Sequence, residues 1–299
     1  MNQEASLDAA TAGKNGSNHL WNRFRSHKTA LFALAGFLGG LVGDLLTEPF
    51  LREGSLPQWV RNSLFGAGIG SVLAPALAGA AALYQRRPPT GSNVVKMVLL
   101  GALGGAVSEV LIAFVYRTGF QLGLVPGSTV AQIYRCVVWG ISGGMIGGLT
   151  AHSVPNLRLW RAIFAGLVGG AIGCLGFLLL SAVVSDVFGR LLGFGVQGLA
   201  IGLSIVVAEK LAREASLEII WAPNEVTFAN LGERPVFIGG GREDDVFVRG
   251  YPPRHAGISL KQGRIEYMEA ASGRQATLKN ASRLEIGKLT LVVHTDTKN

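Results

Sequence analysis

The sequence predicts a polytopic α-helical membrane domain of six helices, arranged as three tandem glycine-rich hairpins, followed by a small all-β sandwich. Three observations predict this fold class. Residues 29–208 are apolar and rich in glycine, whereas the segments on either side are polar. A glycine motif recurs at a constant interval inside the apolar part. After residue 217, short segments alternate apolar and polar side chains, which is typical of half-buried β-strands.

Composition places most of the chain in a membrane. Of its 299 residues, 49% are hydrophobic and only 15% are charged. The formal net charge is +8, but the basic residues gather at the ends of apolar runs. That placement favours a role in membrane topology over binding to nucleic acid. Cys136 and Cys174 lie in apolar segments without a second cysteine or a histidine at motif spacing, so we expect neither a disulfide framework nor a metal site.

Six apolar segments have about the 20 residues that a helix needs to cross the hydrocarbon core of a bilayer. They are residues 29–48, 62–84, 95–116, 134–153, 160–184 and 190–208. Basic residues are more numerous on the side that carries both chain ends, so we expect both termini in the cytoplasm. The compact plan indicates a multi-pass protein of a bacterial inner (cytoplasmic) membrane.

These boundaries divide the chain into four parts. We expect a cytoplasmic N-terminal segment at residues 1–28 and a six-helix transmembrane domain at residues 29–208. A helical connector is expected at residues 209–216 and a cytoplasmic β-sandwich at residues 217–299.

The glycine motif G-x-x-G-G occurs three times, and each start lies 65 residues after the one before. Its first and last glycines are Gly36, Gly40, Gly101, Gly105, Gly166 and Gly170. Glycines at this spacing share one helix face and allow two backbones to approach closely. A second motif, R-x-x-x-aromatic-G, begins at Arg61, Arg135 and Arg190 in the apolar run after each glycine motif. Together the motifs predict a two-helix hairpin repeated three times.

Charged residues also recur inside the apolar runs. Asp44 and Glu109 occupy equivalent positions in the first two repeats, where the third has Cys174. We expect the two acids to form an intramembrane charge cluster with the three motif arginines at the outer ends of the helices. Mutual neutralisation would then close that end of the bundle with ion pairs, the interpretation we favour. The alternative is a ring of charge that lines a path for an ion or a substrate.

The C-terminal part reads as a series of short strands separated by glycine and proline. The alternating segments are residues 226–228, 236–238, 245–248, 257–260, 264–267, 276–278 and 289–293. Strands of this length, with turns every few residues, predict a small β-sandwich or barrel.

Four of its segments resemble a known family, the forkhead-associated domain. They are Ile238-Gly239, residues 245–248, residues 254–258 and residues 284–289, and the resemblance covers about residues 217–295. It implies a cytoplasmic β-sandwich that binds phosphothreonine peptides through its apical loops. The phosphate-contacting pattern of the family is I-G-R, S-x-x-H and S-x-N-G-T. This chain departs from it at three positions and keeps only His255.

The departures remove the groups that bind phosphate. Gly240 stands where the family has arginine, Pro252 where it has serine and Arg274 where it has asparagine. A phosphate dianion requires a bidentate guanidinium and further donors held in place. The candidate residues for binding a partner or an anion on these loops are Arg242, Arg254, His255 and Arg274. The alternative, which we favour, is a solvated surface with a basic loop edge, so that the domain binds a protein without standard phosphothreonine recognition.

No stretch resembles a nucleotide-binding loop, a zinc-binding H-E-x-x-H or a nucleophile elbow. We therefore expect no enzyme and no cofactor. The expected function is a membrane scaffold or assembly component, in contact with the lipid bilayer and with a protein partner, within a larger membrane complex. The alternative is a channel or transporter formed by the helical bundle and regulated by the β-domain.

Overall fold

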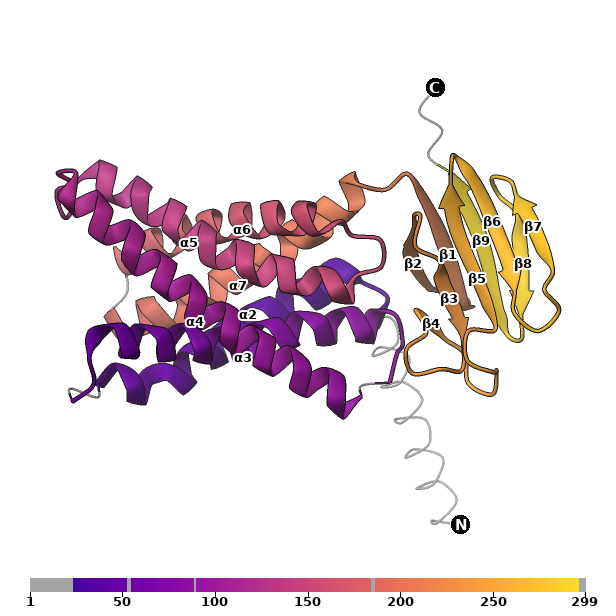
Figure 1. Ribbon diagram of the computed structural model, residues 1–299, viewed down its shortest axis with the longest axis horizontal. Helices are drawn as coiled ribbons and strands as arrows, with labels where there is room; N and C mark the ends of the chain where they lie inside the picture. Colours follow the sequence, from indigo (N-terminus) through magenta and orange to yellow (C-terminus); the bar gives the residue numbers. More distant parts are fainter. Residues whose placement is uncertain (1–23, 53–54, 89, 184–185, 296–299) are drawn as a thin grey trace, which may run out of the picture.

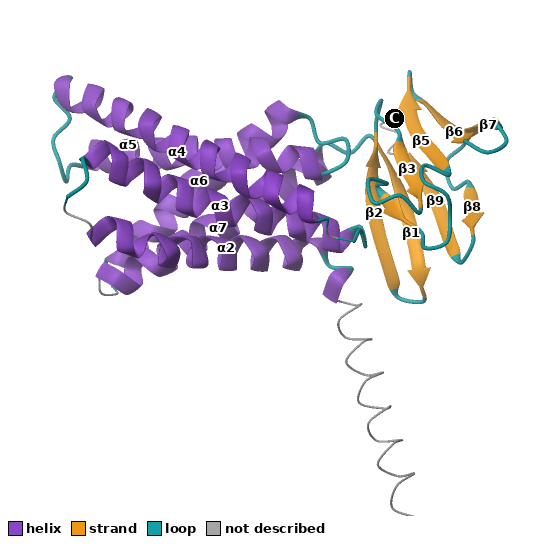
Figure 2. Cartoon of the chain, turned by 60° about the horizontal axis from the view of Figure 1, so that its bottom comes forward, coloured by secondary structure: helices purple, strands orange, loops and turns teal. Residues whose placement is uncertain are grey.

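The computed structural model describes residues 24–52, 55–88, 90–183 and 186–295. It has a helical bundle at one end and a two-sheet β-domain at the other (Figure 1). The bundle contains α2 (Lys28–Arg52), α3 (Gln58–Tyr84), α4 (Gly91–Gln121), α5 (Thr129–Thr150), the short 3-10 helix η1 (Ala151–Ser153), α6 (Leu159–Ser181) and α7 (Asp186–Leu211). Figure 2 shows the same division from a second direction, with the long helices roughly side by side.

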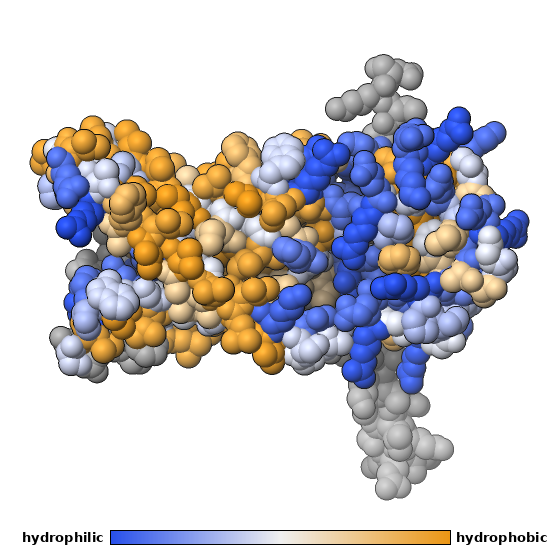
Figure 3. Space-filling model, in the orientation of Figure 1, coloured by the Kyte–Doolittle hydropathy of each residue, from blue (hydrophilic) through white to orange (hydrophobic). Residues whose placement is uncertain are grey.

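In the part of the chain that the structure describes, five of the six long helices are long and apolar enough to cross a membrane: α2, α3, α4, α6 and α7. Helix α5 is the exception, and its first half carries Gln132, Tyr134 and Arg135. The predicted number of six long helices is therefore confirmed. The prediction that they are long and apolar enough to span a membrane is confirmed for five of them. Figure 3 shows an apolar surface over the bundle and a hydrophilic surface over the β-domain, which is the distribution expected of a membrane protein with a soluble domain.

The helices form a ring in chain order, in which each packs on its sequence neighbours and α2 closes against α7. All six glycines at the ends of the G-x-x-G-G motifs lie at these contacts. A Cβ on Gly36 or Gly40 would overlap a carbonyl oxygen of α7. The glycines of the second motif face α3 in the same way, and those of the third face α5. Each motif thus packs its helix against the preceding helix of the ring, across the boundary between hairpins.

The middle glycines point the other way around the ring. Gly39 faces Leu73 of α3, Gly104 faces Leu149 of α5, and Gly169 faces Ile201 of α7. One five-residue motif therefore lets a helix approach both neighbours, because its glycines cover two faces.

The β-domain consists of two facing sheets. One is four-stranded in the order β2-β1-β9-β8, and the other is five-stranded in the order β4-β3-β5-β6-β7. The strands are β1 (Ala215–Ala222), β2 (Glu225–Leu231), β3 (Val236–Gly239), β4 (Val246–Phe247), β5 (Ala256–Lys261), β6 (Arg264–Glu269), β7 (Gln275–Leu278), β8 (Arg283–Ile286) and β9 (Leu289–Thr295). Between the sheets lies a core that includes Leu217, Ile219, Ile238, Ile258 and Leu291, all fully buried.

One predicted element extends too far. The expected helical connector at residues 209–216 ends early, because α7 stops at Leu211 and β1 begins at Ala215. Only residues 212–214 join the two domains. The segment from Ala215 pairs with both β2 and β9, and these ladders outweigh its local helical composition.

Candidate functional site

The bundle holds one buried ion pair at the end far from the β-domain. Arg190 of α7 lies 3.0 Å from the carboxylate of Asp44 on α2 and also pairs with Glu48. Asp44 is only 1% exposed, so its charge depends on this guanidinium for compensation. The pair joins the two helices that close the ring.

The structure does not bring the other predicted members of the charge cluster into that pair. Arg61 donates to Gln58 of its own helix. Arg135 lies 4.7 Å above the ring of Phe177 on α6, a cation–π contact. The carbons of Glu109 lie against Gly66, and among the described residues its carboxylate has no ion pair. The arginines are separate because each lies on a different helix of the ring, α3, α5 or α7.

A second polar site lies at the junction between bundle and β-domain. The outer edge of β2 lies along the helix ends, and the hydroxyl of Tyr84 accepts a hydrogen bond of 2.8 Å from the backbone N–H of Phe228. Lys28 pairs with the buried carboxylate of Glu209, and its ammonium lies 4.9 Å from the Tyr84 ring. The amide of Asn230 donates to the backbone of Glu209 at 3.1 Å. An edge strand that would otherwise expose unpaired backbone groups is thereby covered.

Two arginines after α3 extend the junction. Arg86 pairs with Glu225 at 2.5 Å and stacks over the ring of Trp221. Arg87 pairs with Asp245 at 2.9 Å. Burial lowers the pKa of Arg87, and the Asp245 carboxylate opposes that shift. Both arginines were predicted only as determinants of topology, yet they also tie the β-domain to the bundle.

The loops that correspond to the phosphate-contacting motifs of the resemblance have a closed backbone geometry. A Cβ on Gly240 would overlap the carbonyl oxygen of Tyr251, so an arginine there requires this loop to move. The buried carboxylate of Asp244 accepts hydrogen bonds from the backbone N–H groups of Gly241 at 2.7 Å and Arg254 at 3.0 Å. An acidic side chain thus occupies the interior of this loop, and its negative charge opposes the binding of a phosphate there.

The candidate loop residues are spread over separate surroundings. Arg242 and Arg87 line the same pocket. Neither Arg254 nor Arg274 is among the residues that line this pocket. The guanidinium of Arg254 lies 5.0 Å from the ring of Phe237. The ring of His255 packs 4.9 Å from that of Tyr251. Arg274 contributes its backbone to the β6–β7 turn, where its carbonyl accepts from the Glu269 N–H at 2.9 Å.

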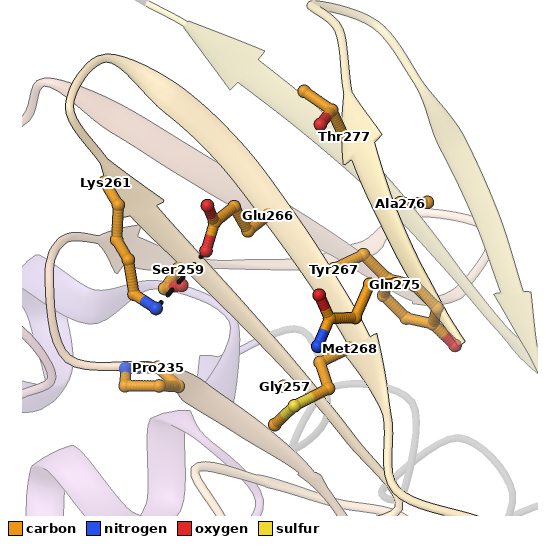
Figure 4. Close-up of a pocket in the computed structure, with 10 residues that line it drawn as sticks. All are labelled: Pro235, Gly257, Ser259, Lys261, Glu266, Tyr267, Met268, Gln275, Ala276 and Thr277. Carbon is orange, nitrogen blue, oxygen red and sulfur yellow. Dashed lines mark ion pairs between the residues drawn. The ribbon is translucent and has the colours of Figure 1, made fainter. Parts of the chain in front are cut away.

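A groove of about 300 Å³ crosses the outer face of the five-stranded sheet (Figure 4). Short side chains form its floor because strand periodicity brings Gly257 and Ser259 of β5 to the same face. Met268 of β6 is exposed beside them, and Lys261 pairs with Glu266 at 3.2 Å at one end. Tyr267 also borders the groove, and burial raises the pKa of its hydroxyl.

The sequence did not predict the groove on the five-stranded sheet. It also did not predict the acidic residues that form ion pairs at the junction between bundle and β-domain. The groove depends on the register of three strands, which a single sequence does not reveal. Glu209 carried a signal, because an acid in the last turn of an apolar helix requires a partner. Among the described residues, no group of three or more His, Cys, Asp and Glu side chains is placed to hold a metal ion.

Comparison with known proteins adds no relative: no protein-family model, no curated protein and no solved structure matches this chain. The similarity to forkhead-associated domains rests on the motifs quoted above.

Proposed function

We propose that this protein is a membrane scaffold that presents a forkhead-associated-like β-sandwich at the cytoplasmic face of a bacterial inner membrane and recruits a protein partner there. Three tandem glycine-rich hairpins form the membrane part, and both chain ends lie in the cytoplasm. The protein acts by binding and positioning, without catalysis, within a larger membrane complex.

The observation that carries this proposal is the contrast between the two sides of the β-domain. The side of β2 is attached to the helix ends through Tyr84, which accepts from the Phe228 N–H, and through Arg86, which pairs with Glu225. Arg87 adds an ion pair to Asp245 beside β4. The outer face of the five-stranded sheet is open and carries the groove. An attached domain with one open face holds a partner in a defined orientation, which is the task of a scaffold.

Packing inside the bundle supports the scaffold over a channel or transporter. Large side chains from four helices meet in one core toward the β-domain, and Phe32, Leu77, Ile146, Ile201 and Ile205 are essentially inaccessible there. A conducting path requires polar groups or water at this depth. The apolar core therefore opposes an ion path that continues inward from Asp44.

Site-specific photo-crosslinking in cells tests the proposal. A photoreactive amino acid at Thr277, in the groove, should yield a discrete crosslinked protein, and Met268→Arg should abolish it. The control position is Glu285 on β8, which is exposed but belongs to the other sheet. A crosslink that survives Met268→Arg, or equal crosslinking from Glu285, would contradict recruitment through the groove.

A further inference from the structure

A pocket of about 290 Å³ lies where α3 and α4 meet the β-domain. One wall is apolar and comes from the helices, with Pro75, Ala78 and Met97. The basic lining of the pocket comes from both domains, with Lys96 of α4 and with Arg234 and Arg242 of the β-domain. We call this cavity the interfacial pocket, because it lies where the apolar surface of the bundle gives way to the polar surface of the β-domain (Figure 3).

The pocket is open because the helices separate at this end. A Cβ on Gly79 of α3 would meet no atom within 4 Å, whereas the motif glycines of the same bundle face backbone atoms. Helix α4 packs on α3 through Gly101 and meets α5 at Gly104, while its first two turns are largely exposed. The interfacial pocket therefore has an apolar side that is open at the surface of the bundle.

Its electrostatics favour an anion. Four arginine and lysine side chains line the pocket against the single acid Glu243. Arg87 is paired with Asp245, and Arg234 lies 3.8 Å from the same carboxylate. Glu243 and Asp244 also act on Arg87, so with Asp245 three carboxylates face the four basic side chains, which leaves one positive charge in excess. No ion pair joins Lys96 or Arg242 to an acid within the described residues.

The start of α4 adds a second, independent signal. Thr90 precedes the helix without a side-chain capping bond, and no acid lies in the first turn. The hydroxyl of Thr90 is buried in the pocket wall, and no partner for it is found within the described residues. Free N–H groups and the helix dipole attract negative charge at such a terminus.

We propose that the interfacial pocket binds an anionic phospholipid of the leaflet nearer to the β-domain. Its phosphate contacts Lys96, Arg242 and the start of α4, and its acyl chains lie along Pro75, Ala78 and Met97. Basic groups at the membrane surface combined with an apolar wall match the two halves of such a lipid. Because the basic wall comes from both domains, the bound lipid also strengthens the attachment of the β-domain to the bundle.

Native mass spectrometry of the full-length protein, purified in detergent, tests this inference. The probe is an equimolar mixture of phosphatidylglycerol and phosphatidylcholine. The wild-type protein should retain the anionic lipid with about tenfold preference, and the Lys96→Gln/Arg242→Gln variant should lose that preference. The matched control, Lys279→Gln/Lys288→Gln, removes the same charge from exposed sites of the β-domain and should retain it.

Two further arms separate the lipid from free phosphate. Gly79→Leu fills the open space without changing any charge, so it should also reduce retention of phosphatidylglycerol. Excess inorganic phosphate should leave the bound lipid in place, because it lacks acyl chains for the apolar wall. Equal retention of both lipids by the wild type, equal loss in both charge variants, or displacement by inorganic phosphate would overturn the proposal.

Discussion

Single glycines set how closely the helices approach. At Gly40 the carbonyl oxygen of Phe194 lies where a side chain would begin, whereas Gly79 of α3 has open space at the same position. In lipid, contacts of this kind supply much of the association energy of helices, because apolar burial gives them little. Substitutions at Gly40 and at Gly79 can therefore be compared to test the role of the glycine motif.

Gly40→Ala should destabilise the bundle, because the added methyl forces α2 away from α7. Overpacking of this kind costs about 1–3 kcal/mol. The control Gly79→Ala should be neutral or stabilising, since alanine favours a helix over glycine by about 1 kcal/mol. Thermal unfolding in detergent measures both. An unchanged midpoint for Gly40→Ala would show that the motif face does not hold the ring closed.

The Asp44–Arg190 pair predicts energetic coupling between two residues far apart in the chain. Asp44→Asn and Arg190→Met should each lower the midpoint of thermal unfolding, because the first removes one of the two carboxylates that pair with Arg190 and the second removes the guanidinium that compensates the buried Asp44. The double variant should lose less than the two losses combined, with a coupling energy of about 0.5–3 kcal/mol. Asp44→Asn combined with Arg135→Met should be additive, since Arg135 stacks on Phe177 instead.

The loops around Gly240 predict that the β-domain does not distinguish phosphothreonine from glutamate. The backbone of Tyr251 fills the place of the missing arginine side chain, and Asp244 occupies the loop interior. Loss of two charge-assisted hydrogen bonds weakens binding by more than about a hundredfold. Titration of the full-length protein with phosphothreonine peptides and matching glutamate peptides measures this. Salt-resistant binding that requires the phosphate would show that other arginines replace the missing contacts.

Among the elements, β2 matters most for how the β-domain is attached to the bundle, because the helix ends cover its free edge. The Tyr84 hydroxyl is the acceptor that satisfies the Phe228 N–H on this edge. An edge strand covered in this way is protected from pairing with other chains.

Tyr84→Phe removes only that acceptor and should loosen the edge of β2 without unfolding the β-domain. A buried N–H left without a partner costs about 1–3 kcal/mol. The backbone amide of Phe228 should exchange its hydrogen faster, while the amide of Leu291, in the central strand β9, should be unaffected. Uniformly faster exchange across both sheets would instead indicate that the whole domain depends on this contact.

The sequence predicted the elements better than their partners. Long apolar runs identify the helices, and alternation identifies most strands, because both signals are local. The predicted helical connector ran to residue 216 and so included the first two residues of the strand Ala215–Ala222, since the pairing of this strand with β2 and β9 is not local. The spacing of Asp44, Glu109 and the arginines predicts that all of them lie near the same end of the bundle. The spacing does not show which neighbouring helix each residue faces. Of these residues, only Asp44 and Arg190 form an ion pair with each other.

At the scale of the whole molecule, a ring of helices carries an attached β-domain at one end. Helix α5 is decisive for the topology, because it is the one helix outside the five that are apolar enough to cross by themselves. Its glycines Gly143 and Gly147 pack directly on α6, which places it within the ring. If α5 crosses with its neighbours, the α4–α5 loop and the β-domain lie on opposite sides of the membrane.

Thiol labelling in cells that carry the protein in their inner membrane tests this arrangement most directly. In a cysteine-free background, Leu122→Cys lies in the α4–α5 loop and Ser272→Cys in the β6–β7 turn, and both sites are exposed. A membrane-impermeant reagent should label Leu122→Cys in intact cells and Ser272→Cys only after the membrane is opened. Labelling of Ser272→Cys from outside, or the same accessibility at both sites, would contradict a scaffold whose β-domain faces the cytoplasm.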